Sequence, residues 1–194
     1  MFEEQDLEKL KKLGVTDSKL LTIKKIHKLA KEIKEIAESY KIILVQPEEI
    51  DRAVNGGDGL NLNWLEAVKQ AEIINELKPD KVVIDCPSPN ITAFKKFLLR
   101  KLIHKPEIIL DHKTELKFIE VAAASVIAKS CREEEVEKIE KLVGESIGSG
   151  YPSNLVCQKF LKENYNKYPE IIRKSWSTYK NLINNKKQKS LSDF

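Results

Sequence analysis

Apolar residues recur at every third or fourth position in several stretches of the chain, which is the spacing of one face of an α-helix. Residues 2–13 show this pattern and end before Gly14, a suitable C-terminal cap. Thr22 would cap a second helix, whose apolar stripe is Ile26, Leu29, Ile33, Ile36 and Tyr40. The pattern predicts further helices at 47–54, 64–77, 94–103, 116–142, 154–165 and 169–183.

Short apolar runs at 41–46, 82–85 and 107–110 instead predict buried β-strands. Because strands alternate with helices, we expect an α/β domain with helices packed on a sheet. The segment VAAAS at 121–125 carries small side chains, and we expect this face of its helix to lie close against the sheet.

Composition narrows the class of protein. A chain of 194 residues with 41% hydrophobic and 33% charged residues predicts one globular domain with at most a small appendage. The sequence has no membrane-spanning apolar run, and its acidic start does not resemble a secretory signal, so we expect a cytoplasmic protein. Its three cysteines form no CxxC pair, which predicts small buried residues rather than a disulfide framework or zinc site.

The net charge of +4 comes mostly from lysine. Lysine meets phosphate as a point charge, so an anionic partner would be held by its backbone rather than by its base sequence. A solvated lysine-rich surface without such a partner explains the composition equally well.

Carboxylates stand at the ends of two predicted strands. Asp85 ends one strand, Asp111 ends the next, and Glu115 follows four residues later. Ligands of open α/β sheets bind at the carboxyl ends of strands, and converging carboxylates select Mg²⁺ or Mn²⁺. A turn former or a helix cap would also place an acid after a strand, and the two prolines of CPSPN favour a turn.

Four motifs occur in order: VVIDCPSPN at 82–90, HKTELKFIEVAAASVIAKSCRE at 112–133, IGSGYPSN at 147–154 and IIRKSWST at 171–178. Together with GVTDSKLLT and LNLNWLEA upstream, they resemble archaeal ribonuclease HII. The resemblance implies an RNase H-like mixed sheet with flanking helices and a helical C-terminal part. It also implies a Mg²⁺- or Mn²⁺-dependent endonuclease that cleaves the RNA strand of RNA/DNA hybrids and nicks DNA 5′ of embedded ribonucleotides.

The resemblance assigns catalytic and metal-binding roles to two residues. Asp85 matches the aspartate that coordinates metal at the end of the family's fourth strand. Glu115 falls where the family motif HKAD has its last carboxylate, so HKTE keeps the charge but adds a methylene. Asp111 precedes the motif at a variable position and ranks below Glu115.

Further residues match substrate-binding positions of the family. Tyr151 matches a tyrosine that packs against the sugar beside the ribonucleotide junction, although an ordinary loop aromatic is the alternative. Candidate phosphate contacts are Asp17, Ser18, Lys19, Lys113, Lys129 and Arg132. The first three form a DSK segment that could also be a surface turn, and the basic residues could be salt-bridge partners. His112 is expected to be a neighbour of the site rather than its general base.

The family opens with a strand ending in DEAGRG, and this sequence has no such segment. We therefore expect the first strands of the fold and two metal ligands to be absent, leaving apolar faces exposed and backbone groups unpaired. An incomplete gene start, a second polypeptide or a relic without catalysis would each explain this. The alternative function is a catalytically silent hybrid- or clamp-binding protein, or one part of a split enzyme.

The final residues, QKSLSDF, resemble the sliding-clamp-binding peptide of archaeal replication and repair enzymes, with Gln188, Leu191 and Phe194 as anchors. A solvated tail is the alternative. We predict an RNase H type 2 domain over 1–183, a flexible tail over 184–194 and a monomer.

Overall fold

The computed structural model describes the backbone of residues 1–15, 18 and 21–191 and the side chains of these residues up to 185. The chain forms two compact units. The first contains Met1–Ile43 and Asn63–Glu133, and the second contains Leu44–Leu62 and Glu134–Phe194.

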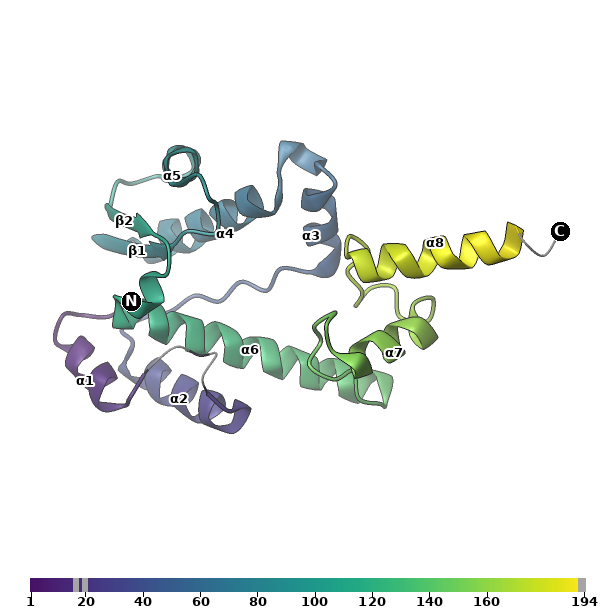
Figure 1. The fold of residues 1–194 in the computed structure, drawn as a ribbon. Helices are drawn as coiled ribbons and strands as arrows, with labels where there is room; N and C mark the ends of the chain where they lie inside the picture. The colour runs from purple at the N-terminus through teal and green to yellow at the C-terminus, as the bar shows by residue number, and fades with distance from the viewer. Residues whose placement is uncertain (16–17, 19–20, 192–194) are drawn as a thin grey trace. The chain divides into compact units, whose positions relative to one another are not determined.

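In the described part of the first unit, the sheet has two parallel strands, β1 (Lys81–Asp85) and β2 (Glu107–Asp111). Figure 1 shows them side by side, with α4 (Leu62–Leu77) and α5 (Ile91–Leu99) next to them. Leu98 of α5 is fully buried and shares a core with Ile74 of α4 and Ile84 of β1. This packing of helices on a parallel sheet confirms the α/β class.

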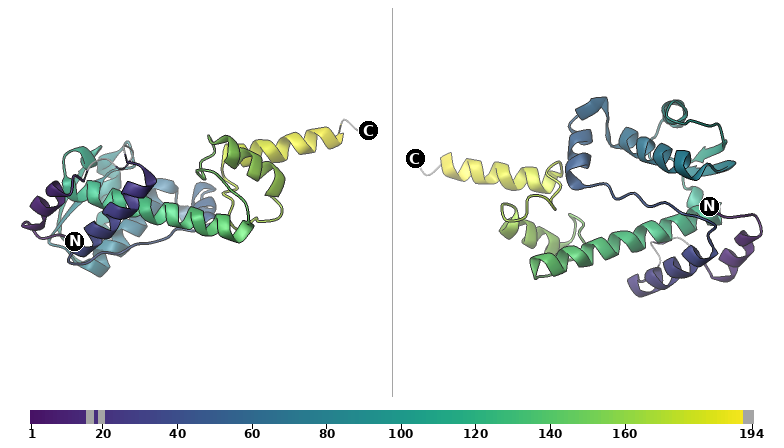
Figure 2. Two further views of the ribbon diagram at one scale, coloured as in Figure 1. Left: turned by 90° about the horizontal axis from the view of Figure 1, so that it is seen from below. Right: turned by 180° about the vertical axis from the view of Figure 1, so that it is seen from behind.

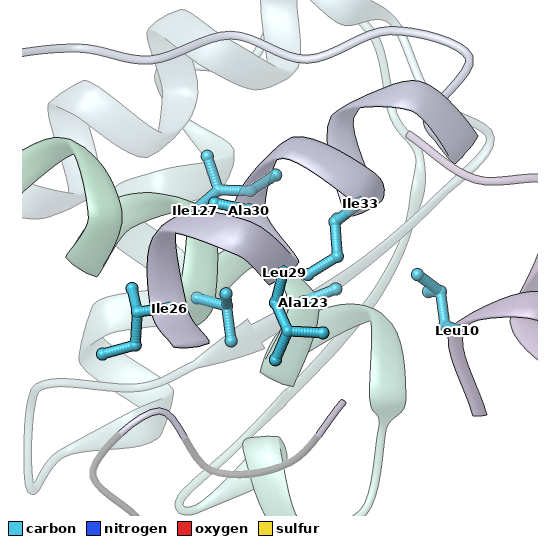
Figure 3. Packing of buried hydrophobic residues seen from close by; sticks show 8 residues of the cluster. Leu10, Ile26, Leu29, Ala30, Ile33, Ala123 and Ile127 are labelled. Atoms are coloured by element: carbon cyan, nitrogen blue, oxygen red, sulfur yellow. The ribbon is translucent and has the colours of Figure 1, made fainter. Parts of the chain in front are cut away.

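A second core of this unit lies between helices. It joins α1 (Asp6–Lys12), α2 (Ile23–Ile36) and the beginning of α6 (Ile119–Val143), as Figure 3 shows. Thr22 caps α2 as predicted, accepting a hydrogen bond from the Lys25 amide at 3.4 Å. Views from two further directions also place α2 beside α6 (Figure 2).

The small-residue segment does not pack as predicted. Ala123 is fully buried against Ile26, Leu29 and Ile33 of α2 rather than against the sheet. A short side chain on α6 lets the bulky aliphatic side chains of α2 approach its backbone, so the small residues serve a contact between two helices.

The predicted strand at 41–46 is wrong, because these residues form no strand in the structure. The run is divided between the two units after Ile43, and Ile42 packs on the helical core of the first unit. The predicted stripe of α2 also ends early, since the helix stops at Ile36 and Tyr40 is 50% exposed.

The second unit contains α3 (Pro47–Val54), the 3-10 helix η2 (Gly57–Gly59), α7 (Leu155–Asn164) and α8 (Ser177–Leu191). The predicted helix at 169–183 begins only at Ser177, because residues 171–176 form a turn. Both oxygens of Asp51 on α3 accept backbone hydrogen bonds from this turn, from Lys174 at 2.7 Å and from Ser175 at 2.9 Å. The predicted domain boundary at 183/184 falls within α8.

Two smaller expectations concern membrane helices and cysteines. None of the helices in the described residues is long and apolar enough to cross a membrane. Cys86 is buried as predicted, whereas Cys131 and Cys157 are only partly buried, so the expectation was wrong for these two.

Candidate functional site

The carboxyl ends of β1 and β2 bring Asp85 and Asp111 together. The two residues are register partners, and the Cys86 amide donates to the Asp111 carbonyl at 2.9 Å, which extends the ladder past them. Side chains of register partners in a parallel sheet leave on the same face. Both carboxylates therefore lie on the same face at one end of the sheet.

These two acids have different partners. Lys117 Nζ lies 2.5 Å from Asp111 Oδ2, and the His112 amide donates to Oδ1 at 2.8 Å. The hydrogen bond from Lys117 and then that from the His112 amide lower the pKa of Asp111 below its ordinary value. Asp85 has no lysine or arginine partner among the described residues, which makes it the better placed of the two acids for a cation.

The turn after β1 shows that Asp85 is not the cap of the helix that follows. Asn90, not Asp85, caps α5, accepting a hydrogen bond from the Ala93 amide at 2.9 Å. Ser88 Oγ accepts from the Asn90 amide at 3.2 Å, so the predicted turn lies within 86–90. Asp85 takes no part in these bonds, and its carboxylate instead faces the segment that follows β2.

That segment is HKTE, and it is bonded to the end of β1. The Thr114 amide donates to Asp85 Oδ1 at 3.3 Å, and His112 Nδ1 lies 3.0 Å from the Cys86 carbonyl. Lys113 reaches this geometry with a positive φ of 55°, and Thr114 is fully buried at the start of the 3-10 helix η3 (Thr114–Leu116). Glu115 therefore follows directly after the residue that holds Asp85. His112 donates to a carbonyl, which fits a neighbour of the site rather than a general base.

Glu66 is an acid near Asp85 that the sequence reasoning missed. The next residue of α4, Ala67, is fully buried in a cluster with Cys86 and Phe94. Burial of the Glu66 carboxyl and then the charge of Asp85 raise its pKa, against a hydrogen bond from Gln70. The residue as a whole is exposed, so it is the carboxyl end that is partly desolvated. The sequence signal that could have identified Glu66 is its position within LNLNWLEA, between the apolar residues Leu65 and Ala67, which are both buried in the structure.

Carboxylate oxygens are hard ligands, the type that Mg²⁺ and Mn²⁺ prefer. Among the described residues, no three His, Cys, Asp or Glu side chains are grouped to hold a metal ion. Magnesium is commonly held by one or two carboxylates, with water and substrate phosphate completing its shell. Asp85 fits such a site, because its carboxylate faces HKTE and has no lysine or arginine partner among the described residues. The charge of Asp85 also raises the pKa of Glu66, and a bound cation would reduce the repulsion between these two carboxylates.

The predicted phosphate contacts of the first unit are in different environments. Lys113 is exposed beside η3, whereas Lys129 of α6 is half-buried. Arg132 pairs with Glu133 at 2.7 Å. Ser18 is buried with its Oγ 2.9 Å from Ser125 Oγ. Asp17 and Lys19 lie outside the described residues.

Tyr151 belongs to the second unit, where its side chain is 48% exposed in the loop before α7. An exposed ring can meet a ligand, and this is what its predicted role requires. Of the predicted clamp anchors, Gln188 and Leu191 lie on the backbone of α8 as it is described, and Phe194 lies outside the described residues.

The comparisons with known proteins agree with the motifs. The family description Ribonuclease HII matches residues 1–179. The chain is 38% identical over 187 residues to ribonuclease HII of Pyrococcus furiosus, covering 94% of this chain and 81% of that protein.

Two solved structures extend the similarity to the fold. The ribonuclease H2 of Pyrococcus horikoshii superposes with a TM-score of 0.83 at 34% identity, over 95% of this chain and 87% of that one. A chain of the PCNA:RNase HII complex from Archaeoglobus fulgidus has a TM-score of 0.79 at 33% identity, over 91% and 83% of the two chains. Because the family match covers residues 1–179 and a curated member is 38% identical over most of both chains, this chain belongs to the ribonuclease HII family.

Proposed function

We propose that the chain is an endonuclease that hydrolyses the RNA strand of RNA/DNA hybrids and nicks DNA 5′ of embedded ribonucleotides, in the cytoplasm. The observation that carries the proposal is the hydrogen bond from the Thr114 amide to Asp85 Oδ1, because it joins HKTE to the strand end of the family's metal-binding aspartate. Membership in a family of nucleases supplies the reaction.

Ribonucleases of this family depend on divalent metal ions, and we propose Mg²⁺ or Mn²⁺ for this chain. Asp85 and Glu115 would hold the ion. When bound, such an ion activates a water molecule and stabilises the leaving oxygen of the phosphodiester. The Thr114 amide orients the Asp85 carboxylate, since a bond to one oxygen restricts rotation of the whole group.

Several residues are proposed to contact the substrate. Exposed Lys113, next to Thr114, can meet a phosphate close to the acids, and Lys129, Arg132 and the DSK segment are proposed to contact phosphates as well. Tyr151 would pack on the sugar beside the junction between ribonucleotide and DNA. Such backbone and sugar contacts fit a protein whose substrate is defined by its chemistry rather than by its base sequence.

We further propose that the C-terminal peptide, with Gln188, Leu191 and Phe194, docks on the sliding clamp. One of the similar structures is that of a PCNA:RNase HII complex, which supports a clamp as partner for this chain. Apolar anchors that enter a pocket commonly supply most of the binding energy of such a peptide.

Nicking of a duplex with one ribonucleotide, in Mn²⁺ or Mg²⁺, tests the proposed function. We expect the wild-type chain to nick 5′ of the ribonucleotide and Asp85→Asn to lose at least about 100-fold in rate, because the amide keeps the shape of the side chain but removes the charge that would hold the ion. Asp111→Asn is the matched control, because Asp111 is already paired with Lys117 and should be dispensable. Binding of the duplex without nicking by the wild-type chain would favour the catalytically silent alternative.

A further inference from the structure

The loop before α7 is built around the side chain of Asn154. Its Oδ1 accepts hydrogen bonds from the amides of Val156 at 2.9 Å and Cys157 at 3.1 Å, which caps the helix. Gly148 lies against the same oxygen with a φ of +65°, and a Cβ at this position would come within 2.4 Å of Asn154 Oδ1. The beginning of the loop and the first turn of α7 are thus fixed to each other.

Two consecutive carbonyls at the tip of this loop are also held. The Asn154 amide donates to the Tyr151 carbonyl at 3.0 Å. Gln158 Nε2, one turn into α7, donates to the Pro152 carbonyl at 2.7 Å. The ring of Pro152 fixes its own φ near −65°. The backbone that follows Tyr151 therefore has little freedom, although the loop is on the surface.

Tyr151 is 48% exposed, and the backbone that holds it sets the direction in which its side chain leaves the loop. A tyrosine ring has only two rotatable bonds, and a fixed backbone leaves few orientations open to it. Binding that orders a mobile ring loses affinity to conformational entropy, whereas a ring already in place avoids this cost. Gln158 is itself exposed, which leaves packing of α7 independent of its side chain.

We propose that Gln158 is a positioning residue for Tyr151. Its amide group holds the Pro152 carbonyl and so keeps the aromatic ring directed for contact with the sugar at a ribonucleotide–DNA junction. The inference rests on the proposed function, since it takes the junction contact of Tyr151 from there. It adds a determinant of substrate selectivity that lies on α7, outside the motif that contains the tyrosine.

Equilibrium binding tests the proposal without any need for catalysis. Fluorescence anisotropy in EDTA would measure the affinity of the full chain for a duplex with one ribonucleotide and for an uninterrupted RNA/DNA hybrid. Gln158→Met keeps the length of the side chain and removes the donor. We expect it to lower the ratio of the two affinities about three- to tenfold, the effect of one hydrogen bond. Gln158→Lys, which keeps a donor of similar reach, should restore most of the ratio.

Two control variants distinguish a positioning role of Gln158 from a general effect on α7 and from the role of Tyr151. Glu163→Gln changes another exposed residue of α7 and should leave the ratio and the thermal midpoint unchanged. Tyr151→Ala should lower the ratio at least as far as Gln158→Met. If Tyr151→Ala lowers it and Gln158→Met does not, the positioning role is wrong while the role of Tyr151 stands.

Three other results would also overturn the inference. Equal loss of both affinities in Gln158→Met, with a lower thermal midpoint, would show a purely structural role. A wild-type affinity ratio near one, or a ratio that Tyr151→Ala leaves unchanged, would show that Tyr151 makes no selective contact at the junction. Failure of the proposed nuclease function would appear separately, as absence of nicking in Mn²⁺ with the binding ratio intact.

Discussion

The proposed match of HKTE to the family motif HKAD would make the acid at Glu115 one methylene longer than the family's aspartate. A longer side chain displaces its carboxylate from the position that an aspartate would occupy, and small displacements of catalytic groups are costly. We expect Glu115→Asp to raise the nicking rate in Mn²⁺ by up to about tenfold. Single-turnover kinetics on a duplex with one ribonucleotide would measure this change.

Glu115→Gln serves as the control for Glu115→Asp, because it keeps the length and removes the charge. Its rate should fall at least about 100-fold if the carboxylate holds the ion. A Glu115→Asp variant slower than wild type would mean that the site is fitted to the longer acid, and a Glu115→Gln variant at the wild-type rate would exclude this residue from the site.

The acids of the site differ in how far the sequence could identify them. Asp85 was proposed through the family resemblance, because its position at a strand end also fitted a turn former or a helix cap; in the structure the cap of α5 is Asn90. Glu66 was not proposed, since an acid on an amphipathic helix is normally solvated, and only the packing of Ala67 against Cys86 brings it near Asp85. The neutralisation of Asp111 by Lys117 likewise depends on the fold of a turn.

Among the elements, α3 and the turn before α8 are joined through Asp51. Burial opposes ionisation of Asp51, but Ser175 and the Lys174 amide, with the charge of Arg173, outweigh it and lower the pKa. A lowered pKa in the folded state stabilises the protein at every pH above the unfolded value of about 3.9. This contribution is lost as the pH falls through the folded pKa.

Asp51→Asn should therefore reduce the free energy of unfolding at pH 7 by about 1–2 kcal/mol, the lower part of the range for charged hydrogen bonds because the carboxylate is partly exposed. The difference from wild type should shrink as the pH falls below about 3.9, because the unfolded chain then takes up a proton at Asp51 before the folded protein does. Urea denaturation at pH 7 and pH 3 would measure it, with Glu170→Gln as an exposed control. A difference that is independent of pH would contradict the assignment to the charge.

Helices were easier to predict than strands for a physical reason. The cap at Thr22 and the apolar stripe of α2 are local features, and the structure has the cap and the stripe as far as Ile36. A strand also needs a partner in space, which a local pattern does not provide. Residues 41–46 have the composition of a strand, but no strand of the described chain pairs with them. Ile42 instead packs against the helical core of the first unit.

For the molecule as a whole, catalysis and recruitment would use different parts of the chain. The acids lie in the first unit, whereas the proposed clamp anchors, Gln188, Leu191 and Phe194, follow in sequence at the end of the chain. A short peptide with few anchors depends strongly on each of them. The sequence could suggest these anchors by resemblance alone, because a short peptide of this kind has no core of its own whose apolar pattern would identify it.

Phe194→Ala should therefore weaken binding of the full chain to the sliding clamp at least about tenfold, since truncation of a buried aromatic anchor typically costs more than 1.4 kcal/mol. Fluorescence anisotropy with labelled chain and purified clamp would measure the affinity. Ser190→Ala lies between the anchors and should bind as wild type. Asp85→Asn should also bind normally although it does not nick, because recruitment is separate from the site. Unchanged affinity after Phe194→Ala would exclude the peptide as the docking segment, and clamp binding, if any, would then involve other surfaces of the chain.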